Sequence, residues 1–235
     1  MRAENQAHHW GPPSAASTVR ANEAHDCYRD GDFAEAAQWC EKGLGCYPED
    51  FANRHFLGFA RLFLNQLESC RNEWACLLAH KELETAQRAL LLNNVAWVDL
   101  MIGGTELLQE ADRFSQEAVK LQGSRAPYLG TRGSVLIELG EADKGLPLVQ
   151  RAFEFNTDPR LKALNACYLV IAEVRRGNSN AATAHRDAAV KLDPNCQLLG
   201  KVERELAQFQ LRSASLAATP ERSPAAIEAF SQMSS

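Results

Sequence analysis

Apolar and small residues recur along the chain with the period of an α-helix. In the stretch from Ala24 to Pro48, Ala24 and Cys27 share one face of a first expected helix, and Gly31 ends that helix. The corresponding face of a second helix consists of Phe33, Ala36, Cys40, Gly43 and Leu44. Two helices of about 14 residues each have too little core to be stable alone, so this unit predicts neighbouring copies stacked against it.

The spacing of this unit returns four more times. Gly58 lies 34 residues after Ala24 and starts the same pattern without a gap. In the third copy no helix-breaking residue occurs between Lys81 and Met101, so its first helix should be about a turn longer than the others and end at Gly103–Gly104. Three extra residues then predict a longer loop between its two helices. The five copies span residues 17–50, 51–84, 85–125, 126–159 and 160–196.

The segments that flank the copies differ from them in composition. Residues 1–16 contain a Pro–Pro pair that a helix interior does not tolerate, and we expect a flexible lead with Ser17 or Thr18 as the N-cap of the first helix. Residues 197–211 predict a capping helix over the last repeat. Its apolar side consists of Leu198, Leu199, Val202, Leu206 and Phe209. Residues 212–235 are rich in Ser, Ala, Thr and Pro and predict a disordered tail.

This period, with its order of small, aromatic and proline residues, resembles the tetratricopeptide repeat (TPR) family over about residues 17–196. The resemblance implies an all-α, right-handed superhelical solenoid of about five helix–turn–helix repeats with a C-terminal capping helix. Copies two to four lack the closing proline, and Arg61, Glu173 and Arg186 stand where the family usually has apolar residues. The third copy is similar to a degenerate form seen in many bacterial members.

Composition is that of an ordinary globular protein, with 46% hydrophobic and 23% charged residues. The net charge is −5, from 25 basic and 30 acidic side chains, and no basic stripe appears. We therefore expect neither nucleic acid nor an anionic membrane as a partner. The chain has no run of 18 apolar residues and no apolar signal core in its first 18 residues, so we expect a cytoplasmic protein with no membrane insertion. Seven scattered cysteines are typical of free thiols in a reducing compartment.

A set of thiol and imidazole groups could in principle hold zinc. Its members are Cys70, Cys76 and His80, with His55 or Cys46 as further ligands. However, Cys27, Cys40 and Cys70 coincide with repeat positions that must be small and buried, where a free cysteine acts as a small apolar residue. There is also no CxxC or HxxxH motif. We therefore interpret these cysteines as packing residues and expect no metal and no cofactor.

Motifs for catalysis are missing from the sequence. Neither GxSxG nor HExxH occurs, and Gly103–Gly104 is not followed by GK[ST], so the glycine pair indicates a helix stop and not a phosphate loop. We expect a protein that is not an enzyme.

The TPR resemblance implies a concave groove lined by the first helix of each pair. Helical spacing selects nine candidate groove residues: His25, Arg29, His55, Phe59, Phe63, Asn93, Trp97, Ser134 and Arg175. Relatives that bind terminal carboxylates use a Lys and an Asn spaced four apart, and here those places hold Ala21 and His25, so the clamp is absent. The aromatic area favours an apolar or helical peptide. The alternative is that Phe59, Phe63 and Trp97 pack inside the superhelix.

These observations predict a non-catalytic protein–protein interaction module, a scaffold or adaptor that binds a peptide or protein segment in the concave groove. A second hypothesis is a chaperone-like or regulatory subunit of a secretion or signalling system. A third is a zinc- or thiol-based redox sensor.

Overall fold

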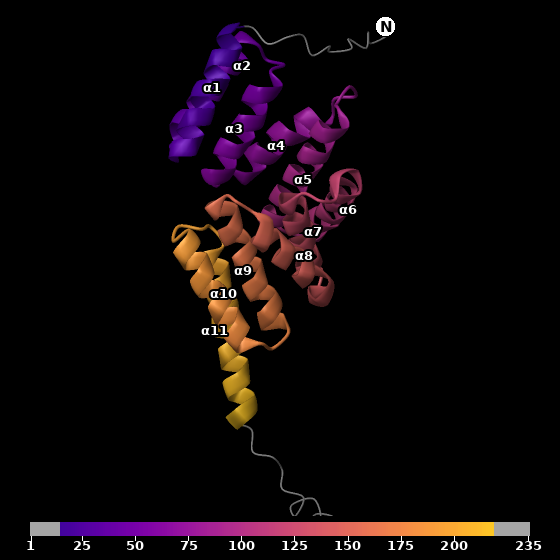
Figure 1. Ribbon diagram of the computed structural model, residues 1–235, viewed down its shortest axis with the longest axis vertical. Helices are drawn as coiled ribbons and strands as arrows, with labels where there is room; N and C mark the ends of the chain where they lie inside the picture. Colours follow the sequence, from indigo (N-terminus) through magenta and orange to yellow (C-terminus); the bar gives the residue numbers. More distant parts are fainter. Residues whose placement is uncertain (1–14, 219–235) are drawn as a thin grey trace, which may run out of the picture. The chain divides into compact units, whose positions relative to one another are not determined.

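The structure is a computed structural model that describes residues 15–218, with side chains as far as residue 214. Within residues 15–218 it contains eleven α-helices and no strand (Figure 1). The all-α prediction is therefore confirmed. The predicted flexible lead lies outside the described residues except for its last two positions, 15 and 16, which are helical.

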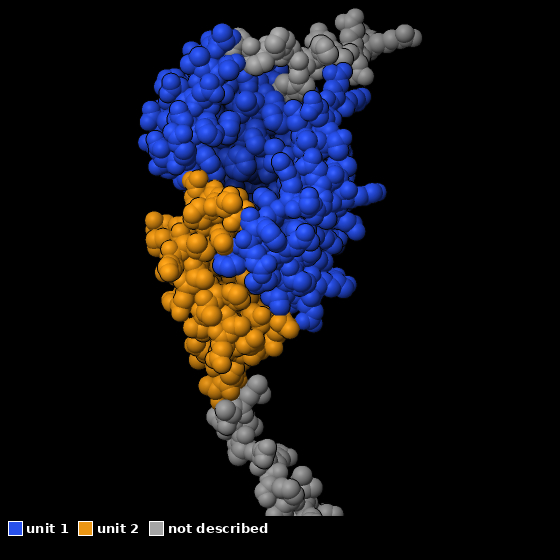
Figure 2. All heavy atoms as spheres, in the orientation of Figure 1, with its two compact units in different colours: residues 1–155 blue, residues 156–235 orange. Residues whose placement is uncertain are grey.

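The helices fall into two compact units, residues 1–155 and residues 156–235, which Figure 2 colours separately. Unit 1 contains α1 (Ala15–Asp30), α2 (Phe33–Cys46), α3 (Phe51–Phe63), α4 (Leu67–Leu78), α5 (Thr85–Ile102), α6 (Thr105–Gln122), α7 (Ala126–Glu138) and α8 (Ala142–Phe155). Unit 2 contains α9 (Pro159–Arg175), α10 (Ser179–Leu192) and α11 (Leu199–Ala218). In each unit consecutive helices pair as hairpins, and first helices also pack together, as α1 does on α3 and α5 on α7.

Short polar turns set the helix ends. Gly31, with φ of +88°, occupies the left-handed region that favours glycine and ends α1 as predicted. The Asp32 carboxylate then accepts a hydrogen bond from the Glu35 backbone N–H at 3.0 Å and caps α2. Asp50 caps α3 in the same way, accepting from the Asn53 N–H at 2.9 Å.

The third hairpin, α5 with α6, confirms the predicted long first helix and corrects the predicted loop. Helix α5 has 18 residues, against 13 in α3, and it ends at Gly103 and Gly104, whose φ values are +82° and +90°. The predicted long loop is wrong, because residues 103–104 alone separate α5 from α6. The extra residues instead lengthen the helices, and α6 also has 18 residues.

Both ends of the described chain differ from the sequence prediction. Helix α1 begins at Ala15, so Ser17 and Thr18 lie inside its first turn and neither is its N-cap. The buried Ser17 hydroxyl instead donates to Asp50 and accepts from Asn53 Nδ2 at 3.0 Å, which joins α1 to α3. The capping helix does not end at residue 211, because α11 continues to Ala218 and the first part of the predicted tail is therefore helical.

The core of unit 1 depends on small residues where helices cross. A buried cluster joins α3, α4 and α5, and we call it the Trp74 cluster: Leu62, Cys70, Trp74, Leu77, Leu91, Val95 and Val98. The indole of Trp74 lies directly against Gly58, where an added Cβ would come within 2.2 Å of Trp74 Nε1. The close packing of α3 against α4 therefore requires glycine at position 58.

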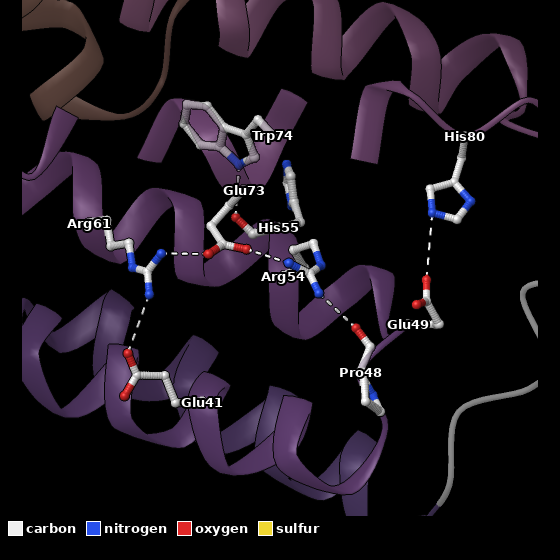
Figure 3. A network of polar contacts seen from close by, with 9 residues as sticks. All are labelled: Glu41, Pro48, Glu49, Arg54, His55, Arg61, Glu73, Trp74 and His80. Atoms are coloured by element: carbon white, nitrogen blue, oxygen red, sulfur yellow. Dashed lines mark hydrogen bonds and ion pairs between the residues drawn. The ribbon is translucent and has the colours of Figure 1, made fainter. Parts of the chain in front are cut away.

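Charged residues at places that the repeat usually fills with apolar ones have partners. Arg61 donates to Glu73, and Arg54 donates to the other oxygen of Glu73 at 2.8 Å, so the two guanidinium groups bracket one carboxylate (Figure 3). In unit 2, Glu173 is almost fully buried and accepts from Arg176 at 3.3 Å. Each charge is thus compensated locally, and the helix pairs keep their packing.

We expect Gly58→Ala to destabilise the protein by about 1–3 kcal/mol, because the new methyl group overlaps the Trp74 ring and must displace it. Gly45→Ala is the matched control, since Gly45 lies in α2 with no heavy atom within 4 Å of its Cβ position. There the helix propensity of alanine should leave stability unchanged or raise it by up to about 1 kcal/mol. Thermal unfolding followed by circular dichroism measures both, and equal melting temperatures would contradict the packing requirement.

Glu73→Gln should also destabilise the protein, by about 1–3 kcal/mol, because it leaves two partly buried guanidinium groups with a neutral acceptor. Glu41 also pairs with Arg61, at 3.5 Å, but its side chain is 57% exposed. Glu41→Gln should therefore cost less than about 1 kcal/mol. Urea unfolding of the two variants tests this order, and a larger loss from Glu41→Gln would refute it.

Candidate functional site

Helices α3, α4 and α5 bring aromatic and amide side chains together in unit 1. We call this group the inner-face cluster: His55 and Phe59 on α3, Trp74 on α4, and Asn93 and Asn94 on α5. The rings of His55 and Phe59 meet edge to face, with centroids 4.9 Å apart and planes at 82°. Phe59 and Trp74 meet in the same way, at 5.0 Å and 73°. Such edge-to-face contacts fix the positions of the rings.

The two amides and the imidazole form a chain of hydrogen bonds. Asn93 Nδ2 donates to Asn94 Oδ1 at 3.4 Å, and Asn94 Nδ2 lies 3.2 Å from His55 Nε2. Because an amide nitrogen only donates, His55 Nε2 must accept, and the ring proton is on Nδ1. At the far end, Asn93 Oδ1 is buried and has no hydrogen-bond partner.

Burial keeps the imidazole of His55 uncharged. It lowers the pKa of His55 from its usual 6.5 to about 4, because the charged form would lose its hydration. The Trp74 indole N–H donates to the backbone carbonyl of His55 at 3.1 Å, and the two residues lie side by side in Figure 3. At neutral pH the inner-face cluster therefore offers hydrogen-bonding groups and rings without a net charge.

The aromatic groove candidates are each half-buried and held by other rings or by the core. Phe59 and Phe63 lie 5.9 Å and 5.7 Å from the ring of Tyr28 on α1, and Phe63 also stacks on Phe33 at 4.7 Å. Trp97 packs against the Trp74 cluster. The packing role that the sequence left open for these three residues is present, and a role in binding stays a prediction.

The remaining groove candidates lie in different surroundings. On α1, the side chains of His25 and Arg29 are 54% and 66% exposed, and Arg29 pairs with Asp26 at 3.2 Å. On α7, Ser134 is fully buried and its hydroxyl has no hydrogen-bond partner. Arg175 is exposed on α9 and belongs to unit 2. The structure thus joins His55, Phe59 and Asn93 in one cluster and leaves the exposed candidates outside it.

Sequence reasoning missed two members of the inner-face cluster. Asn94 was overlooked beside Asn93, although two adjacent amides in an otherwise apolar helix are a signal in themselves. Trp74 was not among the groove candidates, but its indole N–H and ring position His55 and Phe59.

The zinc candidates are not brought together. Cys70 is buried in the Trp74 cluster, where burial raises the pKa of its thiol, whereas Cys76 is exposed. His80 Nε2 lies 3.6 Å from a carboxylate oxygen of Glu49 (Figure 3). Among the side chains that the structure describes, no group of three His, Cys, Asp or Glu is placed to hold a metal ion. No helix within the described ranges is long and apolar enough to cross a membrane.

Comparison with known proteins relates this chain to helical-repeat structures. No protein-family model and no curated protein sequence matches it. Among solved structures it is similar to TTC0263, a thermophilic TPR protein of Thermus thermophilus, with 19% identity and a TM-score of 0.60 over 83% of this chain and all of that one. It is also similar to the MamA fragment from residue 41 onward of Desulfovibrio magneticus RS-1, with 16% identity and a TM-score of 0.53 over 79% and 99% of the two chains.

A third similar structure is the APC/C hetero-tetramer Cut9–Hcn1, at 12% identity and a TM-score of 0.67. The match spans 84% of this chain and 37% of that one. At these identities the similarity concerns the fold. The chain has the tetratricopeptide repeat fold, and the resemblance drawn from its repeat spacing is confirmed at that level.

The low pKa of His55 predicts a dependence of stability on pH. The unfolded chain binds a proton at this histidine below about pH 6.5, and the folded chain binds it only near pH 4, so stability should fall between these values by about 1.4 kcal/mol per pH unit. His55→Gln, which can still accept from Asn94, removes this contribution.

We therefore expect the difference in free energy of unfolding between the wild type and His55→Gln to change steadily from about pH 6.5 to about pH 4, in favour of the variant at low pH. His185, whose pKa burial also lowers, is present in both proteins and cancels in the difference. Urea unfolding at several pH values provides the measurement. A difference that does not vary with pH would show that His55 is not held neutral by burial.

Proposed function

We propose that this chain is a non-catalytic protein-interaction scaffold that binds a peptide segment of its partner on the inner-face cluster. The observation that carries the proposal is the buried Asn93 Oδ1, an acceptor with no donor. A buried acceptor without a partner costs about 1–3 kcal/mol, which a ligand that supplies a donor would recover once the side chains that cover Asn93 move aside. A peptide backbone N–H is the most common donor of this kind.

The chemistry of the cluster favours an uncharged segment. His55 is neutral, Asn93 and Asn94 are amides, and the half-buried ring of Phe59, supported from behind by the buried Trp74, supplies aromatic area. Such a surface suits an extended or helical peptide with apolar side chains, whose backbone amide reaches Asn93 while its side chains lie on the rings. The TPR fold supports the same proposal, because it presents first helices side by side. Within the described residues, no contact favours a secretion, signalling or zinc-sensing role over this one.

The proposal is tested with peptides selected from a random display library on the immobilised full chain. We expect Asn93→Ala to weaken binding of the best selected peptide at least tenfold, because it removes the unpaired acceptor, while the melting temperature changes little. Asn72→Ala is the matched control, since Asn72 is exposed on α4 outside the cluster. Fluorescence anisotropy gives the dissociation constants.

The same peptides separate binding from packing at Trp97. If Trp97 only packs, Trp97→Ala lowers the melting temperature, as a loss of about 3–5 kcal/mol would, and binding falls only as the fold does. If it also contacts the peptide, binding is weakened under conditions where the variant is still folded. Selected peptides that bind Asn93→Ala as tightly as the wild type would refute the proposed site.

A further inference from the structure

Two buried thiols face each other in unit 2. Cys167 lies on α9, Cys196 lies in the segment that joins α10 to α11, and their Sγ atoms are 3.9 Å apart. Cys167 is fully buried and Cys196 is 6% exposed. The pair therefore connects the first helix of the last hairpin with the start of the capping helix α11.

The backbone around Cys196 is held in a defined turn. Its N–H donates to the Asp193 carbonyl at 3.1 Å, and its own carbonyl accepts from the Leu199 N–H at 3.0 Å. Cys167 is fixed in the middle of α9 among buried residues. A disulfide requires the two Sγ atoms to move from 3.9 Å apart to about 2.05 Å.

The other cysteines provide a contrast. Cys40 and Cys70 are buried in separate clusters of unit 1, Cys27 on α1 is half-buried, and Cys46 and Cys76 are exposed. Among the side chains that the structure describes, Cys167 and Cys196 form the one thiol–thiol hydrogen bond. The pair is thus distinguished by geometry and not by burial alone.

We propose that Cys167 and Cys196 form a site of reversible thiol oxidation, which small disulfides such as glutathione disulfide convert to an intramolecular disulfide that ties α9 to the start of α11.

The reaction proceeds by two exchanges. The Cys196 thiolate attacks one sulfur of the small disulfide, which forms a mixed disulfide and releases one small thiolate. The Cys167 thiolate then attacks Sγ of Cys196 and releases the second. The two cysteine protons end on the released thiols, so that two protein thiols and one small disulfide give one protein disulfide and two small thiols.

Cys196 is the group expected to react first. It is the more exposed of the two, and hydrogen bonds from the Cys167 thiol and the Leu198 backbone N–H lower the pKa of its thiol. The hydrogen bond between the two thiols, together with burial, raises the pKa of the Cys167 thiol. Because both sulfur atoms are largely covered, the oxidant must enter when the segment around Cys196 opens, and oxidation should be slow compared with that of the exposed Cys46 and Cys76.

The disulfide would close a loop that contains all of α10. Closing this loop restricts the unfolded chain, so the oxidised protein should melt at a temperature higher by about 5 °C or more. It would also hold the segment before α11 in place, so the backbone amides of α11 should exchange with solvent more slowly.

The experiment uses the full chain with Cys27→Ser, Cys46→Ser and Cys76→Ser, which removes the half-buried thiol of α1 and the two exposed thiols. The reduced protein is incubated with glutathione disulfide under native conditions and analysed by mass spectrometry. We expect the loss of two hydrogen atoms, a cross-linked peptide that joins Cys167 to Cys196, and reversal by dithiothreitol. Cys40 and Cys70 should stay reduced as buried controls.

Two further variants test the order of the steps. With Cys167→Ser, glutathione should remain on Cys196 as a stable mixed disulfide, whereas with Cys196→Ser, Cys167 should remain a free thiol. The proposal is overturned if the cross-link forms only after unfolding in urea, or if native Cys196 keeps glutathione while Cys167 is present. A cross-link that leaves both the melting temperature and the exchange of α11 unchanged would overturn the stabilising effect.

Discussion

The candidate site depends on the contact between Trp74 and Gly58. Because residue 58 has no Cβ, the indole can lie on the backbone of α3 and donate its N–H to the His55 carbonyl. The ring then supports Phe59 from one side and joins the Trp74 cluster, which also includes residues of α5. One close backbone approach therefore sets both the α3–α4 crossing and the position of the imidazole next to the α5 amides.

Charged residues inside the repeats explain how the fold is kept while the sequence departs from the family pattern. Arg61 shares Glu73 with Arg54, and Asp99, fully buried on α5, accepts from Arg71. Burial raises the pKa of Asp99, while the guanidinium of Arg71 opposes that shift. A charged residue that pairs with an oppositely charged neighbour can stand at a usually apolar repeat position without a change in helix packing. A comparison of residue types at single positions does not detect such compensation.

The two units carry different chemistry. In unit 1, buried amides, a neutral imidazole and aromatic rings form a polar but uncharged cluster, on which the proposed peptide site rests. In unit 2, the distinctive feature is a pair of buried thiols at the base of the capping helix. Since each repeat contacts mainly its neighbours, a change confined to the last hairpin can alter local stability without rearranging the first three hairpins.

The sequence by itself determined the helical class, the repeat spacing, the long α5 with its glycine stop and the small residues at the helix crossings. These features are local, because helical period and turn residues act over a few positions. Only the tertiary structure decided that Asn94 meets His55, 39 residues earlier in the chain, that Cys167 meets Cys196, and that the extra residues of the third hairpin lengthen its helices. Those outcomes depend on which side chains face each other across packed helices, and the periodicity of one helix does not specify the surface of its neighbour.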